Sequence, residues 1–440
     1  METKLTRIAE IARERPKEKF TSLAHLLNAE MLAECHKELK SGKAPGVDQQ
    51  TKTLFGENLH TNIETLVENL KTKSYRPQPV ARTYIPKPGS KEKRPLGLPA
   101  HEDKIVQMGL SKILNAIYEQ DFLDISYGFR PGRSCHDALQ TLNHIIEKNK
   151  VSYVVDADIK GFFDHVDHQW TLRMLEERIK DPSIIRLIAR FLKAGCMEEG
   201  KYYETEAGTP QGGVISPIIS NVYLHYALDL WFDKVFKKTC RGEAYMVRYA
   251  DDFICCFQYK DEAERFYQEL QERLQKFNLS ISAEKSKILE FGRFAAETRA
   301  KRDVGKPETF DFLGFTHYCG KSKKGKFRVK RKTSRKKYDA KIQAMKQWIK
   351  DNRNMPIWEL VKKLRPKLSG HYRYYGITDN LKMLVSFYRQ TILLLFKWMN
   401  RRSQRKSFKW DSYNMFLKIC GLPKPRIHVN IYAARSAASC

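Results

Sequence analysis

Two acidic groups in this chain have the residue types and spacing needed to hold a hard metal ion. The first is the pair Asp251 and Asp252 in the tetrapeptide YADD, which lies between the strand-like runs 244–249 and 253–257. A tight turn between two strands places at least one carboxylate at the hairpin tip, where it can ligate a cation such as Mg²⁺. An ordinary acid-rich turn has the same pattern, so other features must decide between the two.

The second acidic group ends an apolar strand. Residues 154–164, VVDADIKGFFD, contain Asp156 and Asp158. They lie two residues apart and therefore on one face of a strand, so spacing alone does not choose between them. If Asp158 meets Asp251 from a neighbouring strand, the two supply the shared carboxylates that a pair of Mg²⁺ ions needs for in-line phosphoryl transfer.

Two further segments are suited to binding phosphate or nucleotide. Residues 208–217, GTPQGGVISP, form a glycine-rich loop before the helix-like run 218–230, and its backbone amides can approach a nucleotide closely. Residues 85–95, IPKPGSKEKRP, form a basic loop that can clamp a triphosphate. Taken alone, the first segment is more often a loop before a capped helix, and the second is more often a solvated charge run.

The elements that would position these residues follow from periodicity and composition. Residues 1–70 are expected to be helical, with one helix over 58–71. Residues 71–95 contain eight basic residues and five prolines, which predicts an extended basic segment. Between 100 and 320, helical stretches alternate with strand-like runs such as 152–159, a pattern typical of α+β or α/β proteins. The tail over 340–420 is expected to be a separate helical domain.

Composition indicates the class of partner. The 80 Lys and Arg against 51 Asp and Glu give a formal net charge of +29, which favours a polyanion: nucleic acid first, an anionic membrane surface second. An apolar content of 42% excludes wholesale disorder, and we find no signal peptide or bilayer-spanning run. The nine cysteines include no CxxC pair, which favours free thiols in a reducing cytosol.

In chain order, the motifs resemble those of bacterial group II intron-type reverse transcriptases. They are IPKPGSKEKRPLGLP, YGFRPGRSCHDAL, VVDADIKGFFDHVDH, GTPQGGVISPIISNVYL, VRYADDFICCF, LSISAEKSKIL and FDFLGF. The resemblance covers roughly residues 40–320. The tail segments LRPKLSGHYRYYG and LFKWMNRRSQRKSFKW resemble the maturase or thumb domain of the same proteins.

The resemblance implies an α+β, right-hand polymerase of fingers, palm and thumb, with a palm sheet and a helical C-terminal domain. We expect an N-terminal helical extension over 1–70, fingers and palm over 71–320, and a basic linker with a helical thumb or maturase domain over 321–440. The C-terminal endonuclease module that intron-encoded members often carry is expected to be missing.

The resemblance also implies the metal site. Asp158, Asp251 and Asp252 match the catalytic carboxylates, and the Ile159 carbonyl lines the site for two Mg²⁺ ions, with Mn²⁺ as a substitute. Asp156 becomes a structural acid. Because Asp252 is adjacent to Asp251 in the turn and points differently, its expected role extends to support of the site.

Nucleotide contacts follow from the same resemblance. Lys87 and Arg94 match triphosphate-binding residues, Gln211 matches a glutamine that packs on the incoming nucleotide, and the Phe163 ring is expected to exclude a 2′-OH, so that dNTPs are used. Either Lys285 or Lys287 is expected to donate a proton to pyrophosphate.

Nucleic-acid contacts are expected in three places. Arg130 and Arg133 would touch the template backbone, and Leu313 and Gly314 would support the primer end. Residues 321–350 hold fourteen Lys and Arg against one Asp, and within them Lys330, Arg331 and Lys332 would hold a duplex or structured RNA through phosphate contacts.

We therefore expect a bacterial, cytoplasmic RNA-directed DNA polymerase that acts on an RNA template, a DNA or RNA primer and dNTPs. We also expect it to bind structured intron RNA and a DNA target, to assist splicing and retromobility, and to have no membrane partner. Two alternatives stay open: a splicing factor with a dispensable polymerase site, and a reverse transcriptase recruited to phage defence, DNA repair or CRISPR adaptation.

Overall fold

The chain divides into two compact units, each described by itself below. The computed structural model describes residues 2–86, 93–402 and 407–433. Of these, unit 1 comprises 2–86, 93–138 and 155–288, and unit 2 comprises the rest. The division falls inside α6 (Cys135–Lys148), β3 (Tyr153–Asp158) and β8 (Lys287–Glu290). The predicted domain boundaries at 70 and 320 stay predictions.

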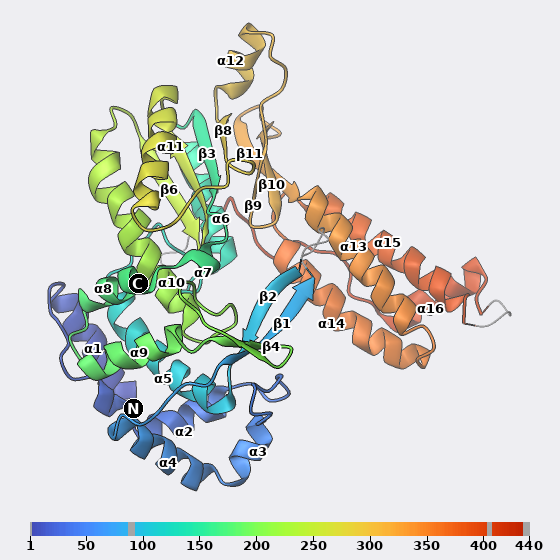
Figure 1. Ribbon diagram of the computed structural model, residues 1–440. Coiled ribbons are helices and arrows are strands. Elements are labelled where there is room, and N and C mark those ends of the chain that lie inside the picture. The colour runs from blue at the N-terminus through green and yellow to red at the C-terminus, as the bar shows by residue number, and fades with distance from the viewer. Residues whose placement is uncertain (1, 87–92, 403–406, 434–440) are drawn as a thin grey trace. The chain divides into compact units, whose positions relative to one another are not determined.

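Unit 1 begins with helices packed around one long buried helix. They are α1 (Glu2–Glu14), α2 (Ala29–Glu38), α3 (Lys52–Glu57), α4 (Leu59–Lys71) and the central α5 (His101–Tyr118). Helices α1 and α2 pack on α5 (Figure 1), whose Ile113, Leu114 and Ile117 are fully buried at helical spacing. The predicted N-terminal helices are confirmed, and the one expected over 58–71 is α4.

A single carboxylate ties the N-terminal region to α9 (Pro182–Leu192), which follows α8 (His168–Glu176). Asp181 caps α9 and also accepts hydrogen bonds from the backbone N–H groups of Leu23 and Ala24, at 2.6 and 2.8 Å. Burial alone would raise the pKa of the Asp181 carboxyl, but its backbone donors outweigh burial and lower it. One buried side chain therefore satisfies the starts of two helical segments.

Within the basic segment 71–95, the described residues 80–86 and 93–95 are extended, as predicted, and residues 87–92 lie outside the described part. Strands β1 (Val80–Pro86) and β2 (Lys93–Leu98) pair antiparallel. In their sheet, in the order β2-β1-β4-β5, β1 also pairs with β4 (Cys196–Glu198), and the edge strands are β2 and β5 (Lys201–Tyr203).

The second sheet carries the predicted acidic residues. Its strand order is β6-β7-β3-β8, with β6 (Ala244–Tyr249) and β7 (Asp252–Phe257) paired antiparallel. The predicted strands over 152–159, 244–249 and 253–257 are confirmed as β3, β6 and β7. Helix α11 (Lys260–Gln275) packs against β7.

Two helices connect this sheet to the glycine-rich loop. The short α7 (Phe162–His165) follows β3, and α10 (Ser216–Leu224) follows the loop. The helix predicted over 218–230 starts earlier than expected and ends as α-helix at Leu224, where the chain continues in π-helical turns over His225–Asp229 and Phe232–Phe236.

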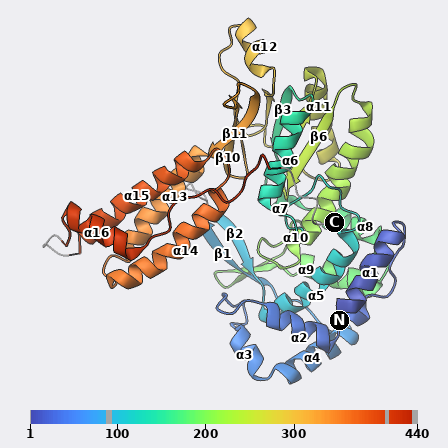
Figure 2. The same cartoon turned by 180° about the vertical axis from the view of Figure 1, so that it is seen from behind.

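Unit 2 combines a small sheet with a helical region. The sheet order is β11-β10-β9, and Figures 1 and 2 both show α13 and α15 side by side. The elements are β9 (Phe310–Phe312), β10 (Phe315–Lys321), β11 (Phe327–Thr333), α12 (Ala295–Lys301), α13 (Arg335–Asp351), α14 (Ile357–Tyr375), α15 (Leu381–Met399) and α16 (Trp410–Cys420). The basic linker expected after residue 320 is wrong, because most of 321–350 is regular structure in β10, β11 and α13.

Two expectations about the whole chain can be compared with the described residues. Eight of the nine cysteines lie in that part of the chain, and all eight are free thiols, as predicted. Among its helices, none is long and apolar enough to cross a membrane.

The shared cap at Asp181 generates a stability prediction. Replacing Asp181 by Ala leaves four backbone donors without their acceptor, and we expect a loss of about 2 kcal/mol or more in the free energy of unfolding. Because the folded-state pKa is lowered, this contribution is present above the ordinary carboxyl pKa near ~4 and is lost as the pH falls through the folded value. Urea titrations at several pH values measure both effects.

A matched control is Thr51→Ala, since Thr51 caps α3 by accepting a single hydrogen bond from the Leu54 N–H. Loss of one exposed cap is expected to cost about 1 kcal/mol. Equal losses for the two variants would contradict the double capping role.

Candidate active site

The hairpin between β6 and β7 presents Asp251 at its tip. Tyr249 pairs with Asp252, which leaves Ala250 and Asp251 as a two-residue turn. Two-residue hairpin turns need positive φ, and Ala250 adopts a φ of 58°. Asp252 begins β7 and is half-buried. The turn predicted from YADD therefore exists, with one carboxylate in the loop and one on the strand.

Asp158 is the last residue of β3, the strand next to β7. Its negative charge interacts with the Asp251 carboxyl. Burial is the main cause that raises the pKa of the Asp251 carboxyl, and the negative charge of Asp158 raises it further. The cation of Arg94 acts in the opposite direction and lowers the Asp251 pKa. The structure thus brings together three of the predicted residues, two acids and one triphosphate-binding base.

The residue after Asp158 has its carbonyl available. Ile159 forms an isolated antiparallel bridge with Ile281, flanked by hydrogen bonds from the Lys160 N–H to the Ser280 carbonyl and from the Ser282 N–H to the Asp158 carbonyl. The central residue of such a bridge uses neither its own N–H nor its carbonyl in the pair. The Ile159 carbonyl is therefore turned away from residues 280–282, as a backbone metal ligand requires.

Of the two lysines left open by the sequence, Lys285 contacts the site. Its Nζ lies 2.6 Å from Asp158 Oδ2, and both side chains are partly exposed. Lys287 is the exposed first residue of β8. The Lys285 ammonium supplies positive charge to the carboxylate on which a metal ion would sit.

The glycine-rich loop is fastened to two elements by its backbone. On one side, the N–H groups of Gly208 and Thr209 donate to the carbonyls of Val166 and Phe163, at 2.7 and 2.8 Å. On the other, the Gln211 carbonyl accepts from the Gly97 N–H of β2 at 2.7 Å.

Gly212 shows why this loop needs glycine. Its φ is +111°, and an added Cβ would lie 2.6 Å from the Gly97 carbonyl oxygen. An L-residue with a side chain is strained in that conformation and would push the loop away from β2.

Phe163 and Gln211 line one cavity of about 360 Å³. The Gln211 amide donates to Asp164 Oδ1 at 3.2 Å, so the two predicted nucleotide residues are joined through α7. The polar lining also includes Arg82, Glu204 and Glu206, which the sequence analysis missed. Arg82 could have been found as the basic residue inside a strand-like run, VARTYIP. No local sequence pattern singles out the two glutamates.

Of two other basic residues predicted to contact nucleotide or template, one is not described and the other is buried. Lys87 lies outside the described residues. Arg130 is buried, pairs with Glu119 at 2.7 Å and donates to the Leu123 and Ser126 carbonyls. A guanidinium with these partners cannot reach a phosphate backbone, so the template contact predicted for Arg130 is wrong.

Arg133 is also engaged within its own loop. It pairs with Asp124 at 2.6 Å and lies over the Tyr127 ring, with about a quarter of its side chain exposed. Its template contact stays a prediction.

In unit 2, Leu313 and Gly314 form the turn between β9 and β10. Their φ values are 50° and 80°. The Tyr374 hydroxyl of α14 donates to the Leu313 carbonyl at 3.0 Å, and an added Cβ at Gly314 would lie 3.2 Å from the Tyr375 hydroxyl. A tight turn bonded to Tyr374 is present at the predicted primer-supporting position, and its role stays a prediction.

The basic run on β11 divides between the two faces of the strand. Lys330 is half-buried and Lys332 exposed, whereas Arg331 between them is fully buried, donates to Asn143 and lies over the Tyr432 ring. Alternation along a strand sends neighbours to opposite faces. The nucleic-acid contact predicted for Arg331 is therefore wrong, while Lys330 and Lys332 share the other face.

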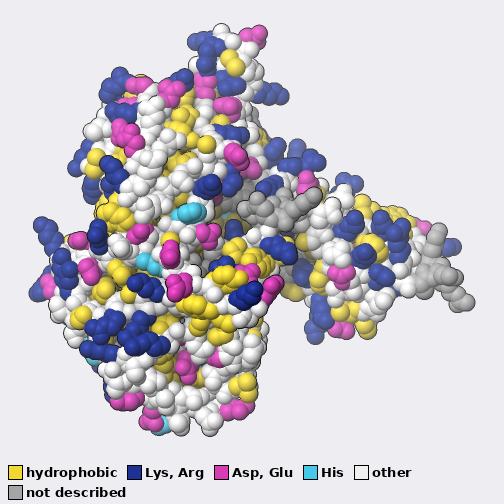
Figure 3. Space-filling model, in the orientation of Figure 1, with side chains coloured by type: hydrophobic (Ala, Val, Ile, Leu, Met, Phe, Trp, Pro, Cys, Tyr) yellow, Lys and Arg dark blue, Asp and Glu magenta, His cyan; other side chains and the backbone are white. Residues whose placement is uncertain are grey.

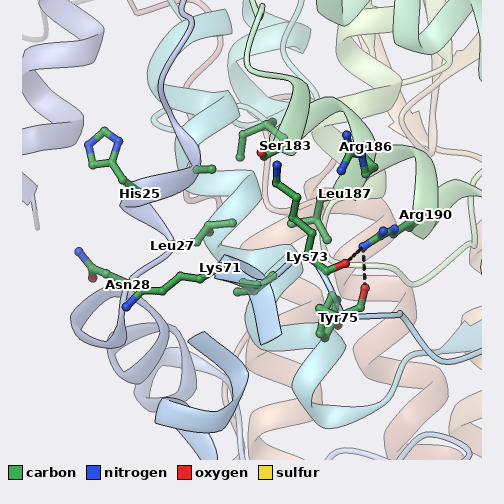
Figure 4. A pocket seen from close by; sticks show the side chains of 13 residues that line it. His25, Leu27, Asn28, Lys71, Lys73, Tyr75, Ser183, Arg186, Leu187 and Arg190 are labelled. Carbon is green, nitrogen blue, oxygen red and sulfur yellow. Dashed lines mark hydrogen bonds between the residues drawn. The ribbon is translucent and has the colours of Figure 1, made fainter. Parts of the chain in front are cut away.

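A second basic surface was not singled out from the sequence. Figure 3 shows Lys and Arg side chains gathered over the region of α9. A pocket of about 170 Å³ there is lined by Lys71, Lys73, Arg186 and Arg190 (Figure 4). The Arg190 guanidinium donates to the Lys73 and Tyr75 carbonyls at 3.0 and 2.8 Å, so it also anchors the segment after α4.

The donor set around Asp158 and Asp251 fits Mg²⁺. No group of three His, Cys, Asp or Glu side chains suited to a metal ion occurs among the described residues. Mg²⁺ is commonly bound through one or two carboxylates, with water and substrate phosphates completing its octahedron. Two aspartates beside an available carbonyl match this mode, and they do not match a closed site built only from side chains.

Parts of the chain are similar in sequence to known proteins. The group II intron-encoded protein LtrA of Lactococcus lactis subsp. cremoris is 41% identical over 225 residues, which are 50% of this chain and 37% of LtrA. Protein YkfC of Escherichia coli strain K12 is 37% identical over 189 residues, 42% of this chain and 49% of YkfC. A nuclear intron maturase of Arabidopsis thaliana is 33% identical over 97 residues, 22% of this chain and 13% of that protein.

The chain thus spans less than half the length of each of these relatives. A family model described as reverse transcriptase (RNA-dependent DNA polymerase) matches residues 85–317, which include Arg94, Asp158, Gln211 and Asp251. Because that match covers more than half of the 440 residues, the chain belongs to the reverse transcriptase family.

Proposed function

We propose that the protein is an RNA-directed DNA polymerase that adds dNTPs to a primer 3′ end. The observation that carries this proposal is that Asp158 ends β3 while Asp251 directly precedes the neighbouring strand β7, so that the charges of Asp158 and Arg94 both act on the Asp251 carboxylate. This combination brings together a place for metal ions and a cation for a triphosphate, which is what phosphoryl transfer needs.

The chain's own residues have distinct roles in this proposal. Asp158, Asp251 and the Ile159 carbonyl would hold two Mg²⁺ ions, or Mn²⁺ in their place, with Asp252 supporting the turn. The ions supply charge neutralisation at the transferred phosphoryl group and activation of the primer hydroxyl. Arg94 binds the triphosphate, and Lys285 holds a proton at Nζ that it gives to the departing pyrophosphate.

The cavity beside Asp164 supports the choice of nucleotide. Phe163 and Gln211 line it together, so a ring and an amide border the same space. We propose that the Phe163 ring fills the volume a ribose 2′-OH would need and that Gln211 packs on the base or sugar. Exclusion of this kind discriminates by steric clash rather than by attraction.

The fold elements take right-hand roles in this proposal. The sheet β6-β7-β3-β8 would be the palm, the β1–β2 hairpin the fingers, and helices α13–α16 the thumb. Lys330, Lys332 and Arg133 would contact the RNA template and primer, and Leu313 with Gly314 would support the primer end.

We further propose that the protein binds group II intron RNA, assists its splicing and acts on a DNA target during retromobility. Similarity to a group II intron-encoded protein and to an intron maturase supports this role. The excess of basic residues also favours a structured polyanion as partner.

The polymerase proposal predicts the effect of Asp251→Asn. This change keeps the side-chain volume but removes the charge that would hold the ions, and we expect primer extension to fall by about a thousandfold, equivalent to several kcal/mol. Extension of a DNA primer on an RNA template with Mg²⁺ and dNTPs measures it.

Asp261→Asn is the matched control, because Asp261 is an exposed acid in the first turn of α11. It is expected to extend primers as the wild type does. Similar extension by the Asp251 and Asp261 variants would refute the metal-ligand role.

The nucleotide-choice proposal predicts that Phe163→Val admits ribonucleotides. Removing the ring opens space for a 2′-OH, and we expect the ratio of kcat/KM for dNTP over rNTP to fall by about 10- to 100-fold. Phe163→Tyr keeps the ring and should keep the ratio. An unchanged ratio in the Val variant, with dNTP incorporation retained, would show that Phe163 does not select the sugar.

The maturase proposal predicts that RNA binding and chemistry are separable. If a folded intron RNA surrounds the reading frame, Asp251→Asn is expected to promote its splicing as the wild type does, because a carboxylate inside the polymerase site does not contact the intron. Splicing assays at limiting Mg²⁺ test this. Loss of splicing in the Asp251 variant, but not in Asp261→Asn, would show that splicing and polymerisation need the same carboxylate, and would contradict this prediction.

A further inference from the structure

A fully buried ion pair lies directly behind the turn that presents Asp251. Arg248 in β6 and Asp229 in the π-helical turn after α10 both have no exposed side-chain surface. The Arg248 Nε donates to Asp229 Oδ1 at 2.7 Å, and Nη2 donates to Asp229 Oδ2, which makes the pair bidentate. All of these groups belong to unit 1.

The remaining donors of Arg248 reach the turn itself. Its Nη1 donates to the carbonyl of Ala250 at 2.9 Å and to the Asn221 side-chain oxygen at 3.0 Å. Asn221, in α10, in turn donates to the Gly128 carbonyl at 2.8 Å. The guanidinium therefore joins a π-helical turn, α10 and the residue that precedes Asp251.

The opposite side of the turn is closed by backbone. The Tyr127 N–H donates to the Arg248 carbonyl at 2.9 Å, and the Arg248 N–H donates to the Ile125 carbonyl at 2.8 Å. A Cβ added at Gly128 would lie 2.3 Å from the Ala250 nitrogen. Ala250 adopts its positive φ between this backbone and the guanidinium, a conformation that persists only when the surroundings impose it.

We propose that Arg248, oriented by Asp229 and Asn221, is the positioning residue of the Asp251 turn. This inference rests on the proposed polymerase function, because it assigns to the buried pair a role in placing a carboxylate for chemistry. Its Nη1 hydrogen bond to the Ala250 carbonyl holds the turn, and its positive charge also lowers the pKa of the Asp251 carboxyl.

The chemistry of the pair favours this role over a contribution to stability alone. A buried ion pair is a weak device for stability, because apolar residues of similar volume often replace it without loss. A planar fork that donates to three acceptors in fixed directions orients what it binds. Nη1 donates to the Ala250 carbonyl, which lies on the turn, and to the Asn221 side-chain oxygen, which lies on α10. The Arg248–Asp229 ion pair therefore sets the position of the turn relative to α10.

The test separates positioning from folding with two variants. The double variant Arg248→Met/Asp229→Leu removes both charges and leaves neither partner buried alone, and it is expected to keep a melting temperature near that of the wild type. Arg248→Lys keeps the charge but cannot donate to Asp229 and to the Ala250 carbonyl together. Should the double variant fail to fold, the Lys variant decides.

For both variants we expect kcat for primer extension to fall by roughly 10- to 100-fold, the effect of a small misplacement of a catalytic group. The KM for dNTP is expected to change little, since the nucleotide-binding side chains are untouched. Wild-type kcat in a folded variant would overturn the proposal.

A second measurement does not depend on polymerase activity. Hydrogen exchange of the peptide spanning residues 244–257 is expected to speed up at the turn in both variants, while exchange in α5 is unchanged. If wild-type protein extends no primer, the polymerase proposal fails, and hydrogen exchange still decides whether Arg248 holds the turn. Unchanged exchange at the turn would overturn the inference by itself.

The matched control removes another ion pair of unit 1, which also has a buried arginine. Arg178 pairs with Asp121 at 3.3 Å and donates to the Pro16 and Ala12 carbonyls, with 4% of its side chain exposed. Arg178→Met/Asp121→Leu is expected to leave kcat and exchange at residues 244–257 unchanged. An equal fall in kcat for this control would show that loss of any buried pair has the same effect, and would overturn the specific role of Arg248.

Discussion

The structure of unit 1 depends on holding two acids near each other at the ends of the central strands β3 and β7 of one sheet. Asp158 and Asp251 repel each other; burial raises the pKa of the Asp251 carboxyl, whereas Asp158 is partly exposed to water that screens its charge. Compensating positive charge comes from three segments: Lys285 contacts Asp158, and Arg94 and Arg248 act on Asp251. The arrangement persists because strands and a backbone-held turn fix the two carboxylates, whatever their mutual repulsion.

A second constraint links β2 to the cavity that is lined by Phe163 and Gln211. The loop 208–213 is bonded to α7 on one side and to β2 on the other, and both bonding sets use backbone atoms. Arg94 on β2 and Phe163 on α7 are therefore held by the same loop. Glycine at position 212 permits the close approach to Gly97 that makes this possible. The spacing between Arg94 and Phe163 is thus set by main-chain hydrogen bonds.

Local sequence patterns predicted much of the fold and the acidic centre of the site. Helix α4, the strands β3, β6 and β7, and the hairpin at YADD were all predicted, because each is specified by residues adjacent in the chain. The choice of Lys285 over Lys287, and the pairing of Arg248 with Asp229, depend on contacts between segments far apart in the sequence. No periodicity reveals such contacts, so the residues that hold the Asp251 turn were missed while the turn itself was found.

The same limit explains why a count of basic residues overstated the binding surface. Arg130, Arg248 and Arg331 are buried, and each is bonded to an acid, an amide or carbonyl groups within its own unit. A buried guanidinium neutralises no phosphate and releases no counterion, so it adds nothing to affinity for a polyanion. The charge that can contact nucleic acid lies on exposed faces, such as the face of β11 that carries Lys330 and Lys332 and the surface of α9 around Arg186. The net charge of +29 therefore combines two populations, one that builds the fold around its acids and one that is free to meet a polyanion.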